Sequence, residues 1–237
     1  MDAFVATMPG VYERLYSTDE MAEHAAIVAR RGARLVHAEV WQSSKQPLLC
    51  VVAEDRPGLL ALVTDALLAQ GMAIQSARAF CREVSRDRAE AVDFLELRAL
   101  GSSNGAVAEL ASENLPVFVQ SLSELIAGDR GPGGPLSASG PSRAPKEPAT
   151  RVYFERQRPA EGSYLLDVDA PDSDGLLHSV SAALHAQRMR IVACEIRTIG
   201  DRALDRFEVE PTSPRTLRDS ELCDIQLAVL DALPSRR

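Results

Sequence analysis

The chain has 237 residues, of which 46% are hydrophobic and 25% charged, a balance typical of a folded globular protein. The formal net charge is -8 and only 5% of residues are aromatic, so the basic surface and stacking side chains of nucleic-acid binders are missing. No stretch approaches the ~20 consecutive apolar residues of a membrane span, and the N-terminus lacks the basic and apolar regions of a signal peptide. We therefore expect a cytoplasmic protein with no nucleic-acid or membrane partner.

The first elements form an N-terminal segment, residues 1–32, and a first unit, residues 33–127. Ser17 and Glu20 have the spacing of a capping box, and the helix that they open is expected to end at Gly32. The first unit then reads strand, strand, helix, strand, strand, helix. The expected ranges are 34–41, 48–53, 58–70, 73–84, 89–100 and 104–126, with a break or kink near Pro116 in the last. Residues 48–53 are all apolar, which predicts a central strand covered on both faces.

A stretch rich in Gly, Pro and Ser, residues 128–149, separates this unit from a second one, residues 150–237. Its composition predicts a flexible tether that spans on the order of 25 Å. The second unit repeats the order of the first, with expected ranges 151–156, 164–169, 175–188, 189–198, 203–210 and 214–233.

The two units contain an ungapped internal repeat, in which residues 50–77 align with residues 167–194. The matching pairs are Asp55/Asp172, Gly58/Gly175, Leu59/Leu176, Leu60/Leu177, Leu67/Leu184, Gln70/Gln187, Met72/Met189 and Ile74/Ile191. Because each unit is long enough for a core of its own, the sequence predicts two tandem domains.

The acidic glycine turn before the first helix of each unit is a candidate ligand site. Unpaired amides at a helix N-terminus suit a carboxylate, and a nearby aspartate suits an ammonium group, so such a turn can hold a free amino acid. In the structural alternative, Asp55 and Asp172 only cap their helices. The second turn also carries Asp174, which would repel a ligand carboxylate. We therefore favour the first turn.

The remaining polar residues predict no metal or cofactor site. His178 and His185 are two helical turns apart, too far for one metal, and are expected on the solvated surface. The doublets Arg30-Arg31 and Arg236-Arg237 are expected at exposed ends of helices or of the chain. No Cys-x-x-Cys spacing occurs, so all the cysteines are interpreted as buried thiols: Cys50, Cys81, Cys194 and Cys223.

The order of elements and the acidic glycine turn resemble the ACT domain, an α+β ferredoxin-like fold with an antiparallel sheet and helices on one face. The motifs D-R-P-G-L-L at Asp55–Leu60 and T-I-G-D-R-A-L-D-R-F-E-V at Thr198–Val209 are similar to the paired ACT domains at the C-terminus of the bifunctional protein-PII uridylyltransferase/uridylyl-removing enzyme family. That family also has a nucleotidyltransferase domain with an Asp-x-Asp metal pair and a His-Asp phosphohydrolase domain. In that family the metal pair follows a Gly-Ser, but here Gly101-Ser102 is followed by no carboxylate pair, and none of the histidines precedes an aspartate, so we expect no catalytic residues.

The resemblance implies that effector amino acids bind near the turn and the following strand, often where two ACT units meet. It places the first site at Asp55, Arg56, Pro57, Gly58, Leu59, Ile74, Gln75 and Ser76, and the second at Asp172, Gly175, Leu176, Ile191 and Val192.

The leading hypothesis is a non-catalytic, allosteric regulator of nitrogen metabolism that binds a small amino acid, with glutamine as the candidate by resemblance, and signals to a protein partner. An alternative is a constitutive ACT oligomer or interaction module without a ligand. A uridylyltransferase is the least favoured reading. We expect a homo-oligomer or a regulated partner, and the sequence leaves open whether the units pair within one chain or between two.

Overall fold

The structure is a computed structural model that describes residues 2–42, 46–85, 88–100, 114–128, 150–158 and 162–233. Most of the expected tether, the first part of the helix expected from Asn104, and the Arg236-Arg237 doublet lie outside these residues.

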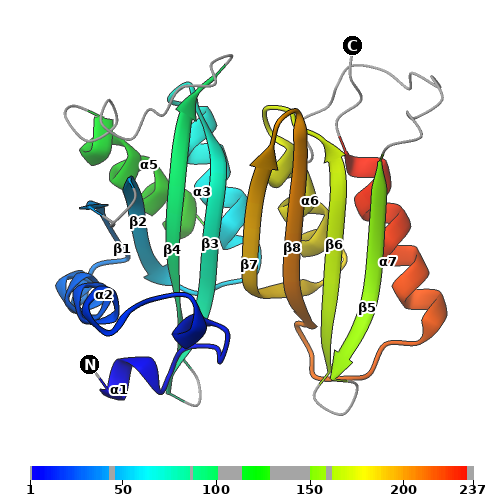
Figure 1. Ribbon diagram of the computed structural model, residues 1–237, viewed down its shortest axis with the longest axis horizontal. Coiled ribbons are helices and arrows are strands. Elements are labelled where there is room, and N and C mark those ends of the chain that lie inside the picture. The colour runs from blue at the N-terminus through cyan, green and yellow to red at the C-terminus, as the bar shows by residue number, and fades with distance from the viewer. Residues whose placement is uncertain are drawn as a thin grey trace.

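The described residues form an α+β fold with one eight-stranded antiparallel sheet and six α-helices (Figure 1). The strand order is β1-β2-β4-β3-β7-β8-β6-β5. The strands are β1 (Val36–Gln42), β2 (Pro47–Glu54), β3 (Met72–Ser85), β4 (Arg88–Ala99), β5 (Arg151–Arg158), β6 (Ser163–Pro171), β7 (Met189–Ile199) and β8 (Arg202–Pro211). The helices are α1 (Asp2–Val5), α2 (Thr18–Arg31), α3 (Leu59–Leu68), α5 (Leu115–Ala127), α6 (Leu176–Ala186) and α7 (Asp219–Ala232), with a 3-10 turn η1 (Tyr12–Arg14).

The order of elements expected for both units is confirmed, and the differences lie at helix ends. The helix α5 begins at Leu115, so Pro116 lies in its first turn, where a missing amide costs little. The last helix begins at Asp219, later than the expected Pro214. The capping box of Ser17 and Glu20 opens α2 as expected.

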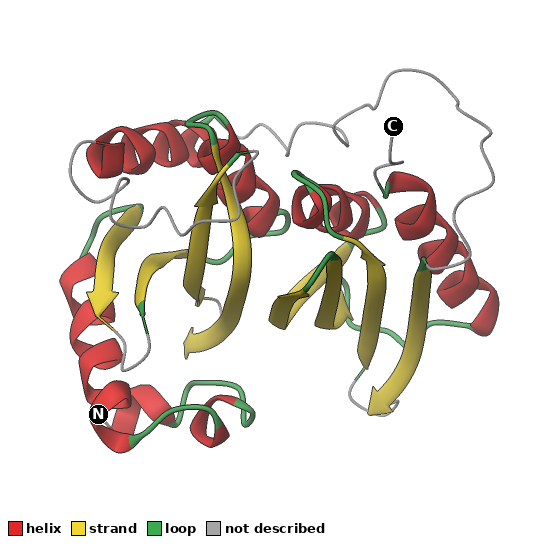
Figure 2. Cartoon of the chain, turned by 45° about the horizontal axis from the view of Figure 1, so that its top comes forward, coloured by secondary structure: helices red, strands yellow, loops and turns green. Residues whose placement is uncertain are grey.

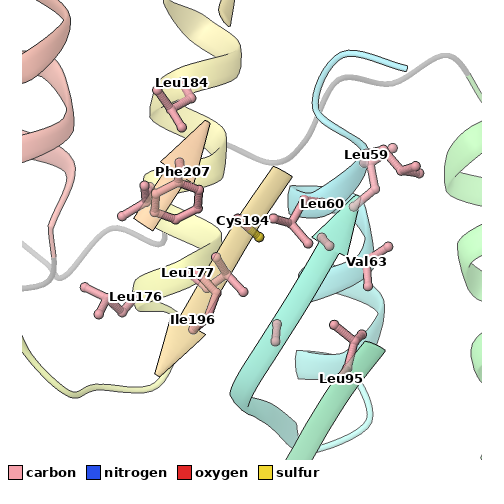
Figure 3. Packing of buried hydrophobic residues seen from close by; sticks show 14 of the residues in the cluster. Leu59, Leu60, Val63, Leu95, Leu176, Leu177, Leu184, Cys194, Ile196 and Phe207 are labelled. Carbon is pink, nitrogen blue, oxygen red and sulfur yellow. The ribbon is translucent and has the colours of Figure 1, made fainter. Parts of the chain in front are cut away.

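The two halves join where β3 pairs with β7, so that one sheet runs through the whole molecule. Four residue pairs form this joint, from Ala77 with Ile196 to Phe80 with Ala193. On one face of the sheet α3 contacts α6, and both helices bury their apolar sides on the strands. Figure 3 shows this shared core, with labelled residues from both halves: Leu59, Leu60, Val63, Leu95, Leu176, Leu177, Leu184, Cys194, Ile196 and Phe207.

The N-terminal segment covers the opposite face of the first half, which corrects the expectation of helices on one face only (Figure 2). Its aromatic residues pack on outward-facing residues of the sheet. The cluster contains Phe4, Met8, Tyr12, Tyr16, Ile27, Val28, Trp41, Cys50, Val52, Phe80, Val92, Phe94 and Ala193. Strand β2 is therefore covered on both faces, as its continuous apolar sequence predicts.

The same face of the second half is covered only in part by the described residues, at Ala193 and Leu165 beside the N-terminal segment. Tyr153 on β5 is 59% exposed, and Leu204 on β8 is also exposed. Other outward-facing positions of these strands form ion pairs between neighbouring strands, such as Arg206 with Asp167 at 2.7 Å. The repeat thus produces two halves with different surfaces.

A buried ionic cluster attaches the N-terminal segment to the sheet. The carboxylate of Glu90 on β4 lies 2.7 Å from Arg31 on α2 and 2.7 Å from Arg82 on β3, and Glu90 is 5% exposed. Arg31 was expected at an exposed helix end. It is instead buried, because α2 ends against the sheet where Glu90 accepts its guanidinium.

One cysteine also departs from expectation. Cys50, Cys81 and Cys194 are buried, but Cys223 is exposed. It lies on α7, whose buried side is formed by Ile225 and Val229.

The buried cluster leads to a prediction for Glu90→Gln. Removing the shared anion leaves two guanidinium groups without their counter-charge, which should lower the free energy of unfolding by about 3 kcal/mol. Chemical denaturation measures this. The control is Glu39→Gln, which breaks the exposed Arg30–Glu39 pair and should cost less than about 1 kcal/mol. Equal losses for the two variants would contradict this account.

A second prediction concerns the left-handed residue in the turn between each repeat helix and the strand that follows it. Gly71 has φ +73°, and the equivalent Arg188 has φ +57°, the only positive-φ residue other than glycine among those described. A side chain in this conformation costs roughly 1 kcal/mol. Arg188→Gly should therefore stabilise the protein by about 0.5 to 1 kcal/mol, while Gly71→Ala should destabilise it by about 1 kcal/mol. Denaturation midpoints check both, and a destabilising Arg188→Gly would refute the explanation.

Candidate functional site

Each acidic glycine turn borders a small cavity at the junction of the two halves. The first cavity has a volume of about 40 Å³ and the second about 30 Å³. Their linings are equivalent in the repeat, because each combines one half's turn and helix N-terminus with the other half's edge strand. The first is lined by Asp55, Arg56, Pro57, Gly58, Leu59, Leu60, Ala61, Ala79, Phe80, Cys81, Ala91, Asp93, Ser181, Met189, Arg190, Ile191 and Val192.

The strand residues are grouped differently from the sequence-based expectation. Ile191 and Val192 were assigned to the second turn but line the first cavity, whereas Ile74 lines the second, with Asp172, Gly175 and Leu176. The cause is the antiparallel joint, which places the start of β3 beside the second turn and the start of β7 beside the first.

The other two residues expected at the first site lie outside both cavities. The carbonyl oxygen of Gln75 accepts a hydrogen bond from Thr198 at 3.1 Å. The hydroxyl of Ser76 donates to Glu96 at 2.6 Å.

The first turn leaves the start of α3 without a side-chain cap. Gly58 is the N-cap residue with φ 84°, a conformation that glycine adopts without strain. Asp55 therefore does not cap the helix. Its carboxylate accepts a hydrogen bond from the Cys81 thiol at 3.1 Å, and Arg56 donates to the carbonyl of Ile126 at the end of α5 at 2.5 Å. The Leu59 amide donates to the Arg56 carbonyl at 3.1 Å, and the amides of Leu60 and Ala61, two residues that line the cavity, lie at the positive end of the helix dipole.

A buried carboxyl group lies at the base of each cavity, and the sequence analysis did not identify either one. Asp93 on β4 is 3% exposed, and its repeat equivalent Asp205 on β8 is 2% exposed. Burial raises the pKa of Asp93 to about 8, with a further contribution from Asp55. Burial also raises the pKa of Asp205 to about 7, against the opposing effect of the Arg197 amide. An aspartate at the equivalent inward position of both strands, where the neighbouring inward residues are apolar, was the available signal.

Arg190 brings a positive charge to the first cavity from the other half. Its Nε lies 4.0 Å from Asp55 and its guanidinium 3.9 Å from Glu210, both beyond hydrogen-bond distance. The Nε is buried without a hydrogen-bond partner. The guanidinium is therefore attracted electrostatically to these two carboxylates but forms no hydrogen bond with either of them.

The second cavity has a different set of charges. Arg98 from β4 reaches the second turn, where it lies 2.6 Å from Asp174 and 3.6 Å from Asp172. Position 73, equivalent to Arg190, is an alanine. An arginine from the first half thus offsets part of the negative charge of the second turn.

His178 also lies at the second cavity, which corrects its expected place on the surface. It is 1% exposed, because α6 packs between the sheet, α3 and α7. Its Nδ1 lies 3.0 Å from Asp65 and 3.3 Å from the Thr64 hydroxyl, both on α3. His185 is only partly buried.

The first cavity combines groups that complement a small zwitterion. Helix amides and a guanidinium attract a carboxylate, and two carboxyl groups attract an ammonium group. Among the described residues no cluster of three or more His, Cys, Asp or Glu side chains could hold a metal ion.

Comparisons with known proteins point to one class of enzyme. No family model matches the chain. The chain is 24% identical over 221 residues to the bifunctional uridylyltransferase/uridylyl-removing enzyme of Caulobacter vibrioides (strain NA1000 / CB15N) and 26% identical over 208 residues to that of Erythrobacter litoralis (strain HTCC2594). These matches cover 92% and 85% of this chain but only 23% and 21% of the relatives. Nearly the whole chain is therefore similar to a minor part of these enzymes, which confirms the resemblance seen in its motifs.

None of the helices formed by the described residues has the length and apolar character needed to cross a membrane.

The buried carboxyls predict a specific pH dependence. The folded-state pKa of Asp93 is about 8, above the usual value of 3.8, so the folded protein holds a proton that the unfolded chain releases. The stabilisation is full below about pH 4 and is lost as the pH rises toward 8, at about 1.4 kcal/mol per pH unit. Asp93→Asn should remove this loss. Its free energy of unfolding, relative to that of the wild type, should therefore be about 2 to 3 kcal/mol greater at pH 7 than at pH 5.

Urea denaturation at the two pH values tests this prediction. Asp205→Asn is the matched variant and should behave similarly, since burial also raises the pKa of Asp205. If the difference in unfolding free energy between the wild type and Asp93→Asn is the same at pH 5 and pH 7, the pKa of Asp93 is not raised in the folded protein.

Proposed function

We propose that this chain is a non-catalytic regulatory module of two ACT domains, which binds a small amino acid in the first cavity and transmits its binding state to a protein partner. The observation that carries this proposal is the composition of the first cavity, where the uncapped start of α3 faces Asp93 and Arg190. The similarity to a minor part of uridylyltransferase/uridylyl-removing enzymes supports a regulatory role.

The position of the cavity supports a route for the signal. Its lining comes from both halves, so a ligand contacts α3 of one half and β7 of the other. A ligand that fits one arrangement of the halves better than another shifts the population toward it. In this proposal the partner recognises the favoured arrangement.

The size of the cavity limits the ligand. A cavity of about 40 Å³ holds a few water-sized groups. The ammonium and carboxylate groups of an amino acid are of that size, but a side chain as long as that of glutamine requires the cavity to widen. Glutamine remains the candidate effector from the resemblance, and such widening would be the conformational change that signals binding.

A second candidate is an interaction module that works without a ligand. The partly uncovered sheet face of the second half favours it, because Tyr153, Leu204 and Ile199 are exposed there among ion pairs. Such a module would form a constitutive oligomer or a complex with another protein. Light scattering after size exclusion separates the two candidates, since only the sensor changes its state when an amino acid is added.

A thermal-shift panel of the protein amino acids at millimolar concentration tests the proposed function. We expect one or a few of them to raise the melting temperature, since a ligand at 100 times its Kd stabilises the folded state by about 2.7 kcal/mol. That corresponds to a rise of roughly 5 to 10 °C for a protein of this size. A panel in which no amino acid shifts the melting temperature would rule out the sensor and leave the interaction module.

A further inference from the structure

We propose that Asp93 receives the ammonium group of the amino acid and that Arg190 of the other half receives its carboxylate, so that only the first cavity binds a ligand. This assignment rests on the proposed function and specifies how the site recognises its ligand and how many bind per chain.

Asp93 is better placed for this role than Asp55, the residue that the sequence favours. Asp55 already accepts a hydrogen bond from Cys81 and lies within 4.0 Å of Arg190. Asp93 is 3% exposed and lines the cavity, and its side chain forms no ion pair with the other described residues. Burying a carboxyl without a partner is costly, and an ammonium group in the cavity would remove that cost.

Arg190 is available for a carboxylate for a similar reason. Its buried Nε has no hydrogen-bond partner, and its two nearest carboxylates are 3.9 and 4.0 Å away. A ligand carboxylate between Arg190 and the first amides of α3 would accept charge-assisted hydrogen bonds from the guanidinium on one side and from the helix N-terminus on the other. The ligand thereby connects β7 of the second half to α3 of the first.

The second cavity lacks this pair of groups. Its buried carboxyl Asp205 is present, but the position equivalent to Arg190 is Ala73. The turn carboxylates Asp172 and Asp174 are paired with Arg98, and the buried ring of His178 stands where the first cavity has Ala61. We therefore expect one ligand per chain.

The groups that face Asp93 also predict a proton exchange on binding. Asp55 on the turn, Cys81 on β3 and Arg190 on β7 line the same cavity, and the buried thiol of Cys194 on β7 lies on the same face of the sheet, whereas the Cys50 thiol on β2 lies on the opposite face. Burial raises the pKa of Asp93 to about 8, so its carboxyl is largely protonated in the empty cavity at pH 7. An ammonium group favours the ionised carboxylate, and the displaced proton passes to the buffer.

The test is a calorimetric titration of the full chain with the amino acid that gives the largest thermal shift, together with its deaminated and decarboxylated analogues. For alanine these analogues are propionate and ethylamine. The wild type should bind one amino acid per chain, at least about tenfold more tightly than either analogue. Titrations in buffers of different ionisation enthalpy should show release of close to one proton at pH 7.

The variants separate the two roles. Asp93→Asn should lose the preference for the amino acid over the deaminated analogue and should release no proton. Arg190→Gln, at a partly exposed side chain, should lose the preference over the decarboxylated analogue. Asp205→Asn is the matched control in the second cavity and should keep the wild-type affinity and the stoichiometry of one.

The outcomes are distinguishable. If no amino acid binds the wild type, the proposed function and this assignment both fail. If an amino acid binds but Asp93→Asn keeps its preference for the ammonium group, only the assignment fails. Two ligands per chain, or loss of binding in Asp205→Asn alone, would also overturn it.

Discussion

The pairing of β3 with β7 is the interaction on which the rest of the structure depends. It joins two units into one eight-stranded sheet and brings α3 against α6. Without it, the edge strands β3 and β7 would expose unpaired amides and carbonyls, and the apolar sides of the two helices would lose their shared core. Both cavities exist because this joint places the start of each strand beside the turn of the other half. In the proposed function, a ligand bound at such a position responds to how the halves are arranged.

The differences between the two halves are as informative as the repeat. The N-terminal segment covers one face of the first half and is held there by the buried Glu90 with its two arginines. The equivalent position in the second half is Arg202, which pairs with Asp169 at the surface. The cavities differ in the same way, since Arg190 has no counterpart in the second one. Divergence of the repeat has therefore given the two halves cavities with different charges and sheet faces with different cover.

Much of the fold follows from the sequence, because its signals are local. The alternation and apolar runs predict every strand to within a few residues, and the ungapped repeat predicts the duplication. The packing on the second face was not predictable, because α1 and η1 are short and their aromatic contacts are distant in sequence. The burial of Arg31 and His178 was also not predicted. Whether such a polar side chain is buried depends on a partner on another element, which is distant in the sequence.

The candidate site was predictable only in part. The turns at Asp55 and Asp172 were identified from their residues, but the strands that complete each cavity were exchanged, because pairing between units depends on contacts far apart in the chain. Asp93 was missed because one acidic residue on the inward side of a strand has no signature within that strand, and only its recurrence at Asp205 marked it. Its importance appears only when its burial and its position below α3 are known.

The most direct test of this account is the nuclear Overhauser contact between β3 and β7 in solution. In uniformly labelled protein, the account predicts cross-strand backbone contacts between residues 77–80 and 193–196, in the register of Ala79 opposite Cys194. These contacts should be absent from isotope-filtered spectra of a mixture of labelled and unlabelled chains, because the strands belong to one chain. Cross-strand contacts that appear only between different chains, or no contacts at all, would contradict the joint and the cavities built on it.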